Sequence, residues 1–466
     1  MNNIRMIFSL VTFFALLLLN NTSFADDSKV YNYKLNNDLQ LIVKVDQRAP
    51  VVLSEIWYHV GSSYEPLGKT GISHVLEHMM FKGTPQYPND TFIKVIAENG
   101  GQQNAMTTQD YTMYYQELAN DKLPLSFKLE ADRMQNLSFS EKDFASELKV
   151  VQEERKMRID NDPLMATYEQ FNAAAYFDNP YQNPIAGWAN DLAQITLDDL
   201  KQWYATWYVP NNTTIIVVGN VDPEEVHKLA DRYFGVIKPK SLPSVKQFSL
   251  PKPIREKNIQ VKLPAKLPIL YMGFNAPSVA SAPNSYEPYA LDVLSTILGG
   301  TNSSRLQKDL VRNKQTAGDI AVYYTLYARL PTLFQIAAIP AQGTSAEQLK
   351  TAILKEIDNL KTKPISKEEL TKIKTQVIAN RIYLLDSIES QGSLIGNLAV
   401  VNLSYSEMDN YQQQVEKLTS EQIEAVAKKY LTKDNLTTGI LLPQSLVENQ
   451  SQKNTPAPAL GISHVN

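Results

Sequence analysis

Residues 74 to 78 read His-Val-Leu-Glu-His, within the longer segment GISHVLEHMMFKGT at 71–84. The chain has 466 residues but only five histidines, and two of them fall in this one segment. On a helix, His74 and His78 would lie on one face about one turn apart, with Glu77 projecting to the same side. Two imidazoles, a nearby carboxylate and an open coordination position are the arrangement of catalytic zinc, and H-x-x-E-H is the inverted zincin motif. In this order Glu77 is the candidate general base and the histidines are the candidate metal ligands.

A third ligand is required, because two histidines rarely hold catalytic zinc alone. The three remaining histidines lie in a predicted strand or far along the chain, which leaves a carboxylate. The acidic candidates lie on a predicted charged helix over 140–160, at Glu147, Glu153 and Glu154. Glu147 and Glu154 are two helical turns apart and share a face, whereas Glu153 lies about 100° away from Glu154. Spacing alone leaves all three open, and a solvated charged surface is the alternative for most of this helix.

The elements that must position these residues form two similar series. In the first we predict a hairpin over 34–46, strands over 51–60, 103–118 and 213–218, and helices over 71–82, 90–99, 140–160, 197–207 and 223–234. A stretch rich in Pro and Lys without periodicity follows at 238–257 and predicts a linker. Beyond it the order restarts, with strands over 267–274, 321–327 and 333–339 and helices over 287–298, 345–360 and 366–382.

An internal comparison indicates a duplication that kept the scaffold and lost the ligands. Aligning Gly83-Thr84 with Gly300-Thr301 places the three motif residues opposite Leu291, Leu294 and Ser295. The segments 200–218 and 423–442 also share a pattern of helix, Asn-containing turn and strand. We therefore predict one metal site per chain and an α+β fold. Two homologous α/β-sandwich-like halves, each a mostly antiparallel sheet packed with helices, would enclose a chamber.

The same patterns set the expected domain boundaries. We predict a metal-bearing peptidase domain over 26–237, the linker over 238–257, a second homologous domain lacking metal ligands over 258–443, and a disordered tail over 444–466. The chain has no cysteine, so no disulfide or lipid-modified cysteine can hold it, and its cores alone must do so. A net charge of −4 without a long basic run argues against nucleic acid as a partner.

The N-terminus has the layout of a secretory signal peptide. One basic side chain, Arg5, precedes an apolar run from Met6 to Leu19, and Ser23-Phe24-Ala25 fits a cleavage site. The apolar run is short for a membrane span, which needs roughly 20 residues. We therefore predict a signal peptide over 1–25, cleavage near Ala25, and an exported, periplasmic or secreted protein without a stable membrane anchor. A retained anchor is the alternative.

Three segments and the glutamate helix together resemble the pitrilysin/insulinase family of zinc metallopeptidases, and its mitochondrial-processing-peptidase-like members in particular. The segments are GISHVLEHMMFKGT (71–84), NGGQQNAMTTQDYTMYY (99–115) and YVPNNTTIIVVGNVDP (208–223), and the resemblance covers nearly all of the mature chain. It implies one Zn²⁺ held by His74, His78 and Glu154, with Glu77 as general base and Glu147 as a supporting acidic residue of the catalytic site. The resemblance, and not the spacing, selects Glu154 over its neighbour Glu153.

The resemblance also implies where a substrate binds. The strand around Asn104, Ala105 and Thr107 is expected to pair with an extended peptide by β-strand addition. Ordinary strand polarity is the alternative for Asn104 and Thr107. Family members with a complete site also carry, in the second half, an arginine and a tyrosine seven residues apart that hold the substrate. Arg312 stands at the arginine position and is an expected substrate-binding residue, but Asp319 stands at the tyrosine position.

This departure leaves the subunit composition open. Tyr323 and Tyr324 are close to the tyrosine position but out of register. A homologous partner chain would supply an Arg/Tyr pair if this chain is the metal-bearing member of a heterodimer; a homodimer is another arrangement. Alternatively, another residue of this chain substitutes for the tyrosine.

From the sequence we therefore expect an exported zinc metalloendopeptidase that hydrolyses peptides or small unfolded proteins. Zn²⁺ is the expected cofactor, and peptides are the expected partners. The alternative is a non-catalytic peptide-binding or assembly subunit of a periplasmic complex. Because all four residues expected to bind the metal or act as base are intact, the sequence favours the enzyme.

Overall fold

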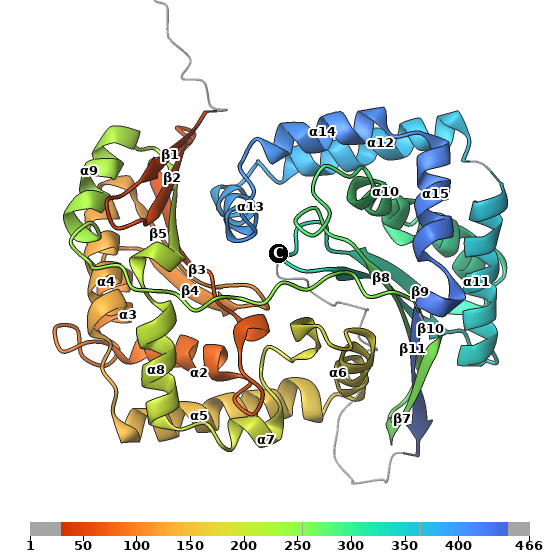
Figure 1. The fold of residues 1–466 in the computed structure, drawn as a ribbon, viewed down its shortest axis with the longest axis horizontal. Helices are drawn as coiled ribbons and strands as arrows, with labels where there is room; N and C mark the ends of the chain where they lie inside the picture. The colour runs from red at the N-terminus through yellow and green to blue at the C-terminus, as the bar shows by residue number, and fades with distance from the viewer. Residues whose placement is uncertain (1–28, 254, 364, 446–466) are drawn as a thin grey trace, which may run out of the picture.

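The computed structural model describes residues 29–253, 255–363 and 365–445, which form two sheet-and-helix halves side by side (Figure 1). The predicted signal peptide, and all of the predicted tail beyond residue 445, lie outside the described residues. The first sheet has six strands in the order β1-β2-β6-β3-β5-β4. These are β1 Val30–Lys34, β2 Gln40–Val45, β3 Val51–Tyr58, β4 Gln102–Thr107, β5 Thr112–Ala119 and β6 Thr213–Gly219.

The second sheet repeats the plan of the first. Its five strands run in the order β7-β11-β8-β10-β9. They are β7 Lys257–Pro264, β8 Ile269–Ala276, β9 Ala317–Tyr324, β10 Thr332–Pro340 and β11 Leu436–Gln444. Each sheet contains one parallel pair, β2 with β6 and β7 with β11, at the equivalent place, and its other pairs are antiparallel. The predicted α+β fold of two similar halves is thus confirmed.

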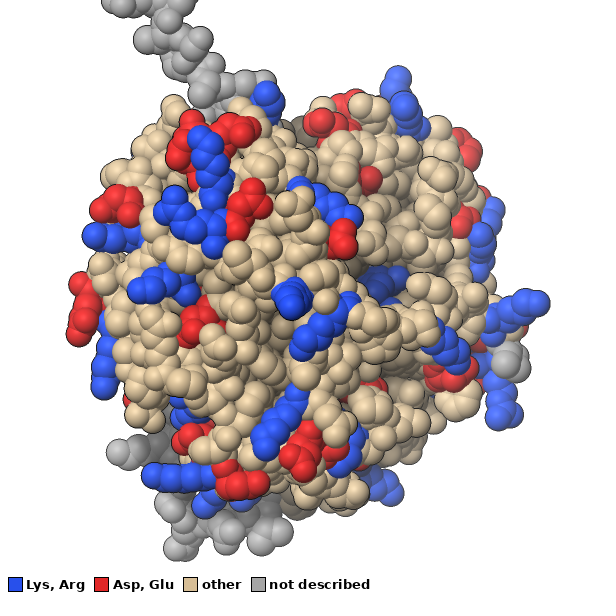
Figure 2. Space-filling view, turned by 60° about the vertical axis from the view of Figure 1, so that its left-hand side comes forward, with Lys and Arg blue, Asp and Glu red and all other residues tan. Residues whose placement is uncertain are grey.

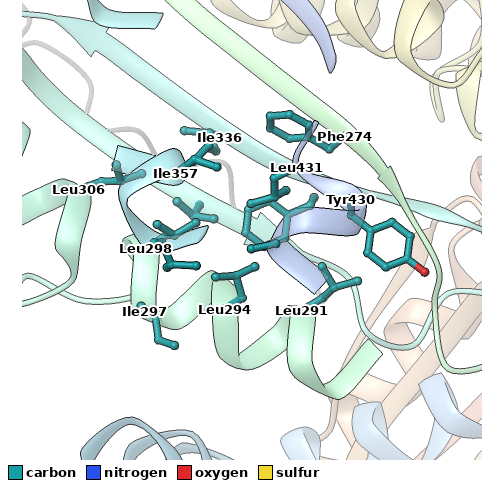
Figure 3. Close-up of a cluster of buried hydrophobic side chains, with 14 of the residues drawn as sticks. Phe274, Leu291, Leu294, Ile297, Leu298, Leu306, Ile336, Ile357, Tyr430 and Leu431 are labelled. Carbon is teal, nitrogen blue, oxygen red and sulfur yellow. The ribbon is translucent and has the colours of Figure 1, made fainter. Parts of the chain in front are cut away.

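Helices cover the outer face of each sheet (Figure 1). In the first half they are α2 Ile72–Met79, α3 Thr91–Glu98, α4 Leu123–Asn136, α5 Glu141–Arg155, α7 Ala189–Leu192, α8 Leu197–Trp207 and α9 Pro223–Tyr233. In the second half they are α10 Glu287–Gly299, α11 Ala346–Thr362, α12 Lys367–Tyr383, α14 Glu407–Lys417 and α15 Ser420–Tyr430. Leu291 and Leu294, which replace motif residues on α10, are fully buried in the second core (Figure 3). Helix positions that carry polar motif residues in the first half therefore carry apolar, packed side chains in the second half.

The inner faces of the sheets are covered by two exchanged helices. Neighbouring strand residues alternate between two cores, so that Ile56 faces the outer core while Trp57 faces the inner one. Helix α13, Ile388–Val400, comes from the second half and packs on β3 and β6 of the first sheet. Helix α6, Pro163–Ala175, comes from the first half and packs on β7, β8 and β11. Each half therefore supplies the helix that covers the inner face of the other half's sheet.

Glycines allow each of the two exchanged helices to pack close to the sheet that it covers. A Cβ at Gly396 of α13 would lie 2.2 Å from the ring of Trp57, and a Cβ at Gly273 of β8 would lie 2.7 Å from the ring of Phe171 on α6. Both distances are far below van der Waals contact, so a larger residue would push the exchanged helix off its sheet. In the first half the glycine lies on the exchanged helix and the ring on the strand, whereas in the second half the glycine lies on the strand and the ring on the exchanged helix.

Three features of the fold differ from the sequence predictions. The single strand predicted over 103–118 is a hairpin, β4 and β5, because residues 108–111 turn and the backbone N–H of Thr108 donates to the carbonyl of Tyr111 at 2.8 Å. The predictions also assigned no helix to the segments that form α4, α6, α13 and α14. The strand predicted over 321–327 begins earlier, at Ala317, and ends at Tyr324.

Basic and acidic side chains are mixed across the face shown in Figure 2. Among the described residues, no helix is both long enough and apolar enough to cross a bilayer. A cavity of about 640 Å³ lies between the halves and is lined by residues of both, including Tyr64 and Arg329.

The contact between α13 and the first sheet generates a prediction about pH. Glu55 on β3 is 2% exposed and accepts a hydrogen bond from Trp57 Nε1 at 2.8 Å. Burial raises the pKa of Glu55 from 4.5 to about 8. The folded protein thus keeps a proton that the unfolded chain loses, so this contribution to stability is complete below about pH 4.5 and is lost as the pH rises through 8.

Glu55→Gln should therefore raise the melting temperature of the metal-free protein more at pH 8 than at pH 5. The measurement is thermal unfolding by circular dichroism at both pH values, with the exposed Glu98→Gln on α3 as the matched control. A shift of equal size at both pH values would show that Glu55 is ionised in the folded protein.

Candidate metal centre

Helix α2 carries both motif histidines, and the carboxylate of Glu65 fixes its first turn. The residue before the helix, Gly71, has a left-handed backbone with φ 90° and no side chain to cap the helix. Glu65 takes this role: its carboxylate accepts the backbone N–H of Gly71 at 2.6 Å and of Ser73 at 2.8 Å. Glu65 thereby satisfies donors that a helix start leaves unpaired. Burial raises the pKa of Glu65 to about 7. No motif or spacing in the sequence marks Glu65.

The side chains of His74 and His78 on α2 and of Glu154 on α5 converge. The distances from Glu154 Oε2 are 3.7 Å to His74 Nε2 and 3.5 Å to His78 Nε2. One ligand atom from each of the three residues lies within 4.8 Å of the others. Tetrahedral zinc with bonds of about 2.0–2.2 Å needs ligand atoms roughly 3.4 Å apart. The donor set and its spacing therefore fit a zinc ion after a small contraction.

Glu147 and Lys82 hold the ring of His78. The Nδ1 atom of His78 lies 3.2 Å from Glu147 Oε2, and Lys82 Nζ lies 2.6 Å from the other oxygen of that carboxylate. With Nδ1–H donating to Glu147, the lone pair of Nε2 points toward Glu154, which is the tautomer that a metal ligand needs. Lys82 was not among the predicted site residues, although it stands four residues after His78 in the segment 71–84.

The two neighbouring glutamates on α5 separate clearly. Glu154 faces the histidines, and Arg158 Nη1 contacts its second oxygen at 2.7 Å, which leaves one oxygen for a metal. Arg158 lies in the π-helical turn Lys156–Asp160 that continues α5. The side chain of Glu153 is 57% exposed and lies 4.0 Å from Lys156 Nζ. The structure thus brings Glu154, and not Glu153, to the histidines.

In the metal-free site, the shifts in pKa favour the ionisation states that metal ligands require for His74 and Glu154, but not for His78. Burial and the neighbouring His78 lower the pKa of His74 to about 4. The hydrogen bond with His78 lowers the pKa of Glu154 to about 2. For His78, burial lowers the pKa, but the contacts with Glu154 and Glu147 and the charge of Glu77 together outweigh burial, so the net pKa is raised. His74 Nδ1 is buried without a hydrogen-bond partner among the described residues. A neutral imidazole and an ionised carboxylate are what zinc binds.

Glu77 lies between the metal cluster and the edge of the first sheet. Burial raises its pKa. Thr107 Oγ1 on β4 donates to Glu77 Oε2 at 2.5 Å, so the hydroxyl orients the carboxylate. β4 is the last strand of its sheet, and the side chain of Asn104 accepts the backbone N–H of Ala105 at 2.9 Å. The segment expected to bind substrate is therefore an edge strand in contact with the expected base.

The second-half residues are arranged differently from a substrate clamp. Arg312 is exposed on the π-helical segment Gln307–Asn313. Asp319 Oδ1 accepts the N–H of Ile320 at 2.8 Å and Gln307 Nε2 at 3.1 Å. Tyr324 donates its hydroxyl to the carbonyl of Pro277. Asp319 and Tyr324 are thus committed to local contacts, and among the described residues Arg312 makes no ion pair with the metal cluster.

The chain resembles known peptidases along most of its length. Residues 41–188 match the family model described as insulinase (peptidase family M16), and residues 194–377 match the peptidase M16 inactive domain. Zinc protease PqqE of Helicobacter pylori is 31% identical over 418 residues, which cover 88% of this chain and 92% of that protein. The uncharacterized zinc protease YmxG of Bacillus subtilis is 27% identical over 411 residues, with coverages of 87% and 96%. The chain therefore belongs to the insulinase (M16) family of peptidases.

Solved structures agree with this assignment. The crystal structure of a protease from Helicobacter pylori matches with a TM-score of 0.83 and 31% identity, covering 89% of this chain and 100% of that one. The periplasmic protease PqqL of Escherichia coli shares the fold, with a TM-score of 0.76 and 17% identity, and the match covers 93% of this chain but 52% of that one. The resemblance deduced from the motif segments is thus confirmed at the level of the family.

The contact between Glu147 and His78 predicts an effect on metal affinity. Glu147→Gln keeps the shape of the side chain but removes the charge that holds His78 Nδ1–H and Lys82. Loss of such an outer partner weakens metal binding by about 10- to 100-fold. The measurement is zinc competition against a chromogenic chelator, with the exposed Glu153→Gln on the same helix as control. Equal zinc affinity in the two variants would show that Glu147 does not support the site.

Proposed function

We propose that this chain is an exported zinc-dependent endopeptidase that hydrolyses peptides or small unfolded proteins. The observation that carries the proposal is the convergence of His74, His78 and Glu154 beside Glu77. The three residues are the proposed ligands of one Zn²⁺, and Glu77 is the proposed general base. Glu147 is proposed to support the site through His78. Membership of a family whose relatives are named zinc proteases supports this assignment.

The chemistry follows from the position of Glu77. A zinc ion held by the three ligands would polarise the scissile carbonyl and lower the pKa of a water molecule. Glu77 would take a proton from this water as it attacks the carbonyl carbon, and would then give the proton to the leaving amine. Thr107 holds one oxygen of the carboxylate, which limits the rotation of the Glu77 side chain.

The outer edge of β4 is the proposed substrate-binding site. A peptide in extended conformation would add as a seventh strand beside β4, with main-chain hydrogen bonds giving affinity. Because Asn104 already occupies the N–H of Ala105, the carbonyl of Ala105 is the group we expect to bind the peptide. Thr107, at the end of this strand, would place the bound peptide next to Glu77. Arg312 remains a proposed substrate contact from the second half.

We also propose that the active unit contains a second, homologous chain. The support is that Asp319 stands where the family has a tyrosine and is held by Gln307. A further support comes from PqqL, in which the fold of this whole chain matches about half of one longer chain. A partner carrying an Arg/Tyr pair, or a second copy of this chain, would face the metal site. Export rests on the signal-like N-terminal segment over 1–25.

Glu77→Gln tests the catalytic proposal. The variant should bind one zinc ion per chain as the wild type does, because the three ligands are unchanged, while peptide hydrolysis falls by roughly 10²- to 10⁴-fold, the usual contribution of general acid–base catalysis. The measurements are zinc content by mass spectrometry and cleavage of a quenched fluorescent peptide. Undiminished cleavage by Glu77→Gln would sink the assignment of the base.

The partner proposal is tested on the mature chain purified from its own cell envelope. We expect a homologous chain to co-purify, and the separated zinc-loaded chain to lose at least about tenfold in kcat/KM, which corresponds to about 1.4 kcal/mol. Hydrolysis at an undiminished rate by the isolated monomer would contradict the proposal.

A further inference from the structure

Asp110, in the turn between β4 and β5, joins the two halves of the chain in a buried ion pair. Its carboxylate accepts hydrogen bonds from Arg329 of the second half, from Nε at 3.2 Å and from the backbone N–H at 3.1 Å. It also accepts Ser63 Oγ at 2.9 Å and the hydroxyl of Tyr181. Asp110 is 8% exposed and the side chain of Arg329 is 12% exposed. Removing one partner would leave the other charge poorly compensated.

Arg329 also binds a second segment of the first half. Its Nη2 donates to Ser63 Oγ at 2.7 Å, and its guanidinium lies 4.2 Å from the ring centroid of Tyr64. Ser63 and Tyr64 belong to the short helix η1, Ser62–Tyr64. The backbone N–H groups of Ser62 and Ser63 donate to the carbonyls of residues 108 and 109, at 3.0 and 2.8 Å. The guanidinium of Arg329 therefore contacts both η1 and Asp110 of the β4–β5 turn.

Each of these two segments leads directly into the metal site. Glu65 follows η1 and holds the backbone N–H groups at the start of α2, the helix of the two histidines. Thr107 precedes the β4–β5 turn and holds the carboxylate of Glu77. The zinc-binding helix and the base are thus each connected to Arg329 through a short, hydrogen-bonded path.

We propose that Arg329 is a positioning residue for the metal site, through which the second half sets the orientation of α2 and of Glu77. This inference rests on the proposed peptidase function. The second half, which has lost the motif residues, then contributes to the reaction by holding η1 and the β4–β5 turn in place. Arg329 itself does not touch the reacting atoms.

A second contact between the halves provides a matched control. Gln391 on α13 donates from Nε2 to Asp46 Oδ2 at 2.9 Å, and both residues are buried. Asp46 follows β2, which three strands, β6, β3 and β5, separate from β4 in the sheet. Gln391→Ala therefore weakens the junction between the halves without touching η1 or the β4–β5 turn.

The test compares Arg329→Lys, Arg329→Gln and Gln391→Ala, all in the full mature chain with its partner if one is required. Arg329→Lys keeps the charge but cannot bind Asp110 and Ser63 in the same geometry, so it separates positioning from loss of folding. Both Arg329 variants should lose roughly 10-fold in zinc affinity and in kcat, as outer-shell changes do. Gln391→Ala should stay within about twofold of the wild type in both, even at an equal loss of melting temperature.

Amide hydrogen exchange supplies a readout that needs no activity. The amides of Gly71 and Ser73 should exchange faster in Arg329→Lys than in Gln391→Ala, because the Glu65 carboxylate that protects them is less well fixed. Equal zinc affinity and equal exchange in these two variants would overturn the inference. If the wild type binds zinc but does not cleave peptides, the proposed function fails, whereas the differences in zinc affinity and exchange still decide the role of Arg329.

Discussion

The packing of α2 against α5 is the contact on which the site depends. The two histidines stand on α2 and the carboxylate on α5, so no metal site forms unless these helices meet at one register. The buried apolar side chains of α2, Ile72, Val75, Leu76 and Met79, fix its rotation about its axis. That rotation turns His74 and His78 toward Glu154, at 3.7 and 3.5 Å. Apolar burial is non-directional, so it does not fix where the helix lies along the surface on which it packs. Hydrogen bonds must fix that position.

Those hydrogen bonds come from groups around the helix. Glu65 fixes the start of α2, while Glu147 and Lys82 fix the ring at its end. Thr107 does the same for Glu77 from the adjacent sheet edge. A helix N-terminus with a buried carboxylate and a histidine with a charged outer partner are both devices that reduce motion of a ligand set. These hydrogen bonds therefore hold the side chains of the candidate site in place in the metal-free protein.

The second half shows what the same scaffold does without a metal. On α10 the positions of the motif are occupied by residues such as Leu291 and Leu294, which are buried in the core. The exchange of α6 and α13 means that neither sheet is covered on both faces by its own half. Each half thus depends on the other for part of its buried apolar area. The second half therefore keeps its fold although it lacks the motif residues, because the first half depends on it for packing.

The sequence could predict the features that arise from local pattern. The motif at 74–78, most of the strand-like runs and the restart after the linker correspond to observed elements, and the two-half α+β fold is confirmed. Helices α6 and α13 could not be predicted in the same way, because each packs on the sheet of the other half. The two internal glycines of α13, Gly392 and Gly396, also weaken its helical pattern. The β4–β5 turn escaped prediction because Thr108, Gln109 and Asp110 continue a polar, Thr-rich strand pattern.

The site residues also fall into two groups: those that a local sequence pattern or the family resemblance predicts, and those that only the folded chain brings together. The spacing of His74, Glu77 and His78 was sufficient to place them on one helix face, and the family resemblance selected Glu154. Glu65, Lys82 and Arg329 act through contacts between segments, and no periodicity marks such residues. Their roles follow only from the distances in the folded chain.

The most direct test is X-ray absorption spectroscopy of the zinc-loaded wild-type protein, compared with Glu154→Gln. Two imidazole nitrogens and one carboxylate oxygen at about 2.0–2.2 Å are expected around a single zinc ion, with the carboxylate contribution lost in the variant. A zinc environment without two imidazoles, or a spectrum that Glu154→Gln leaves unchanged, would contradict the proposed metal centre.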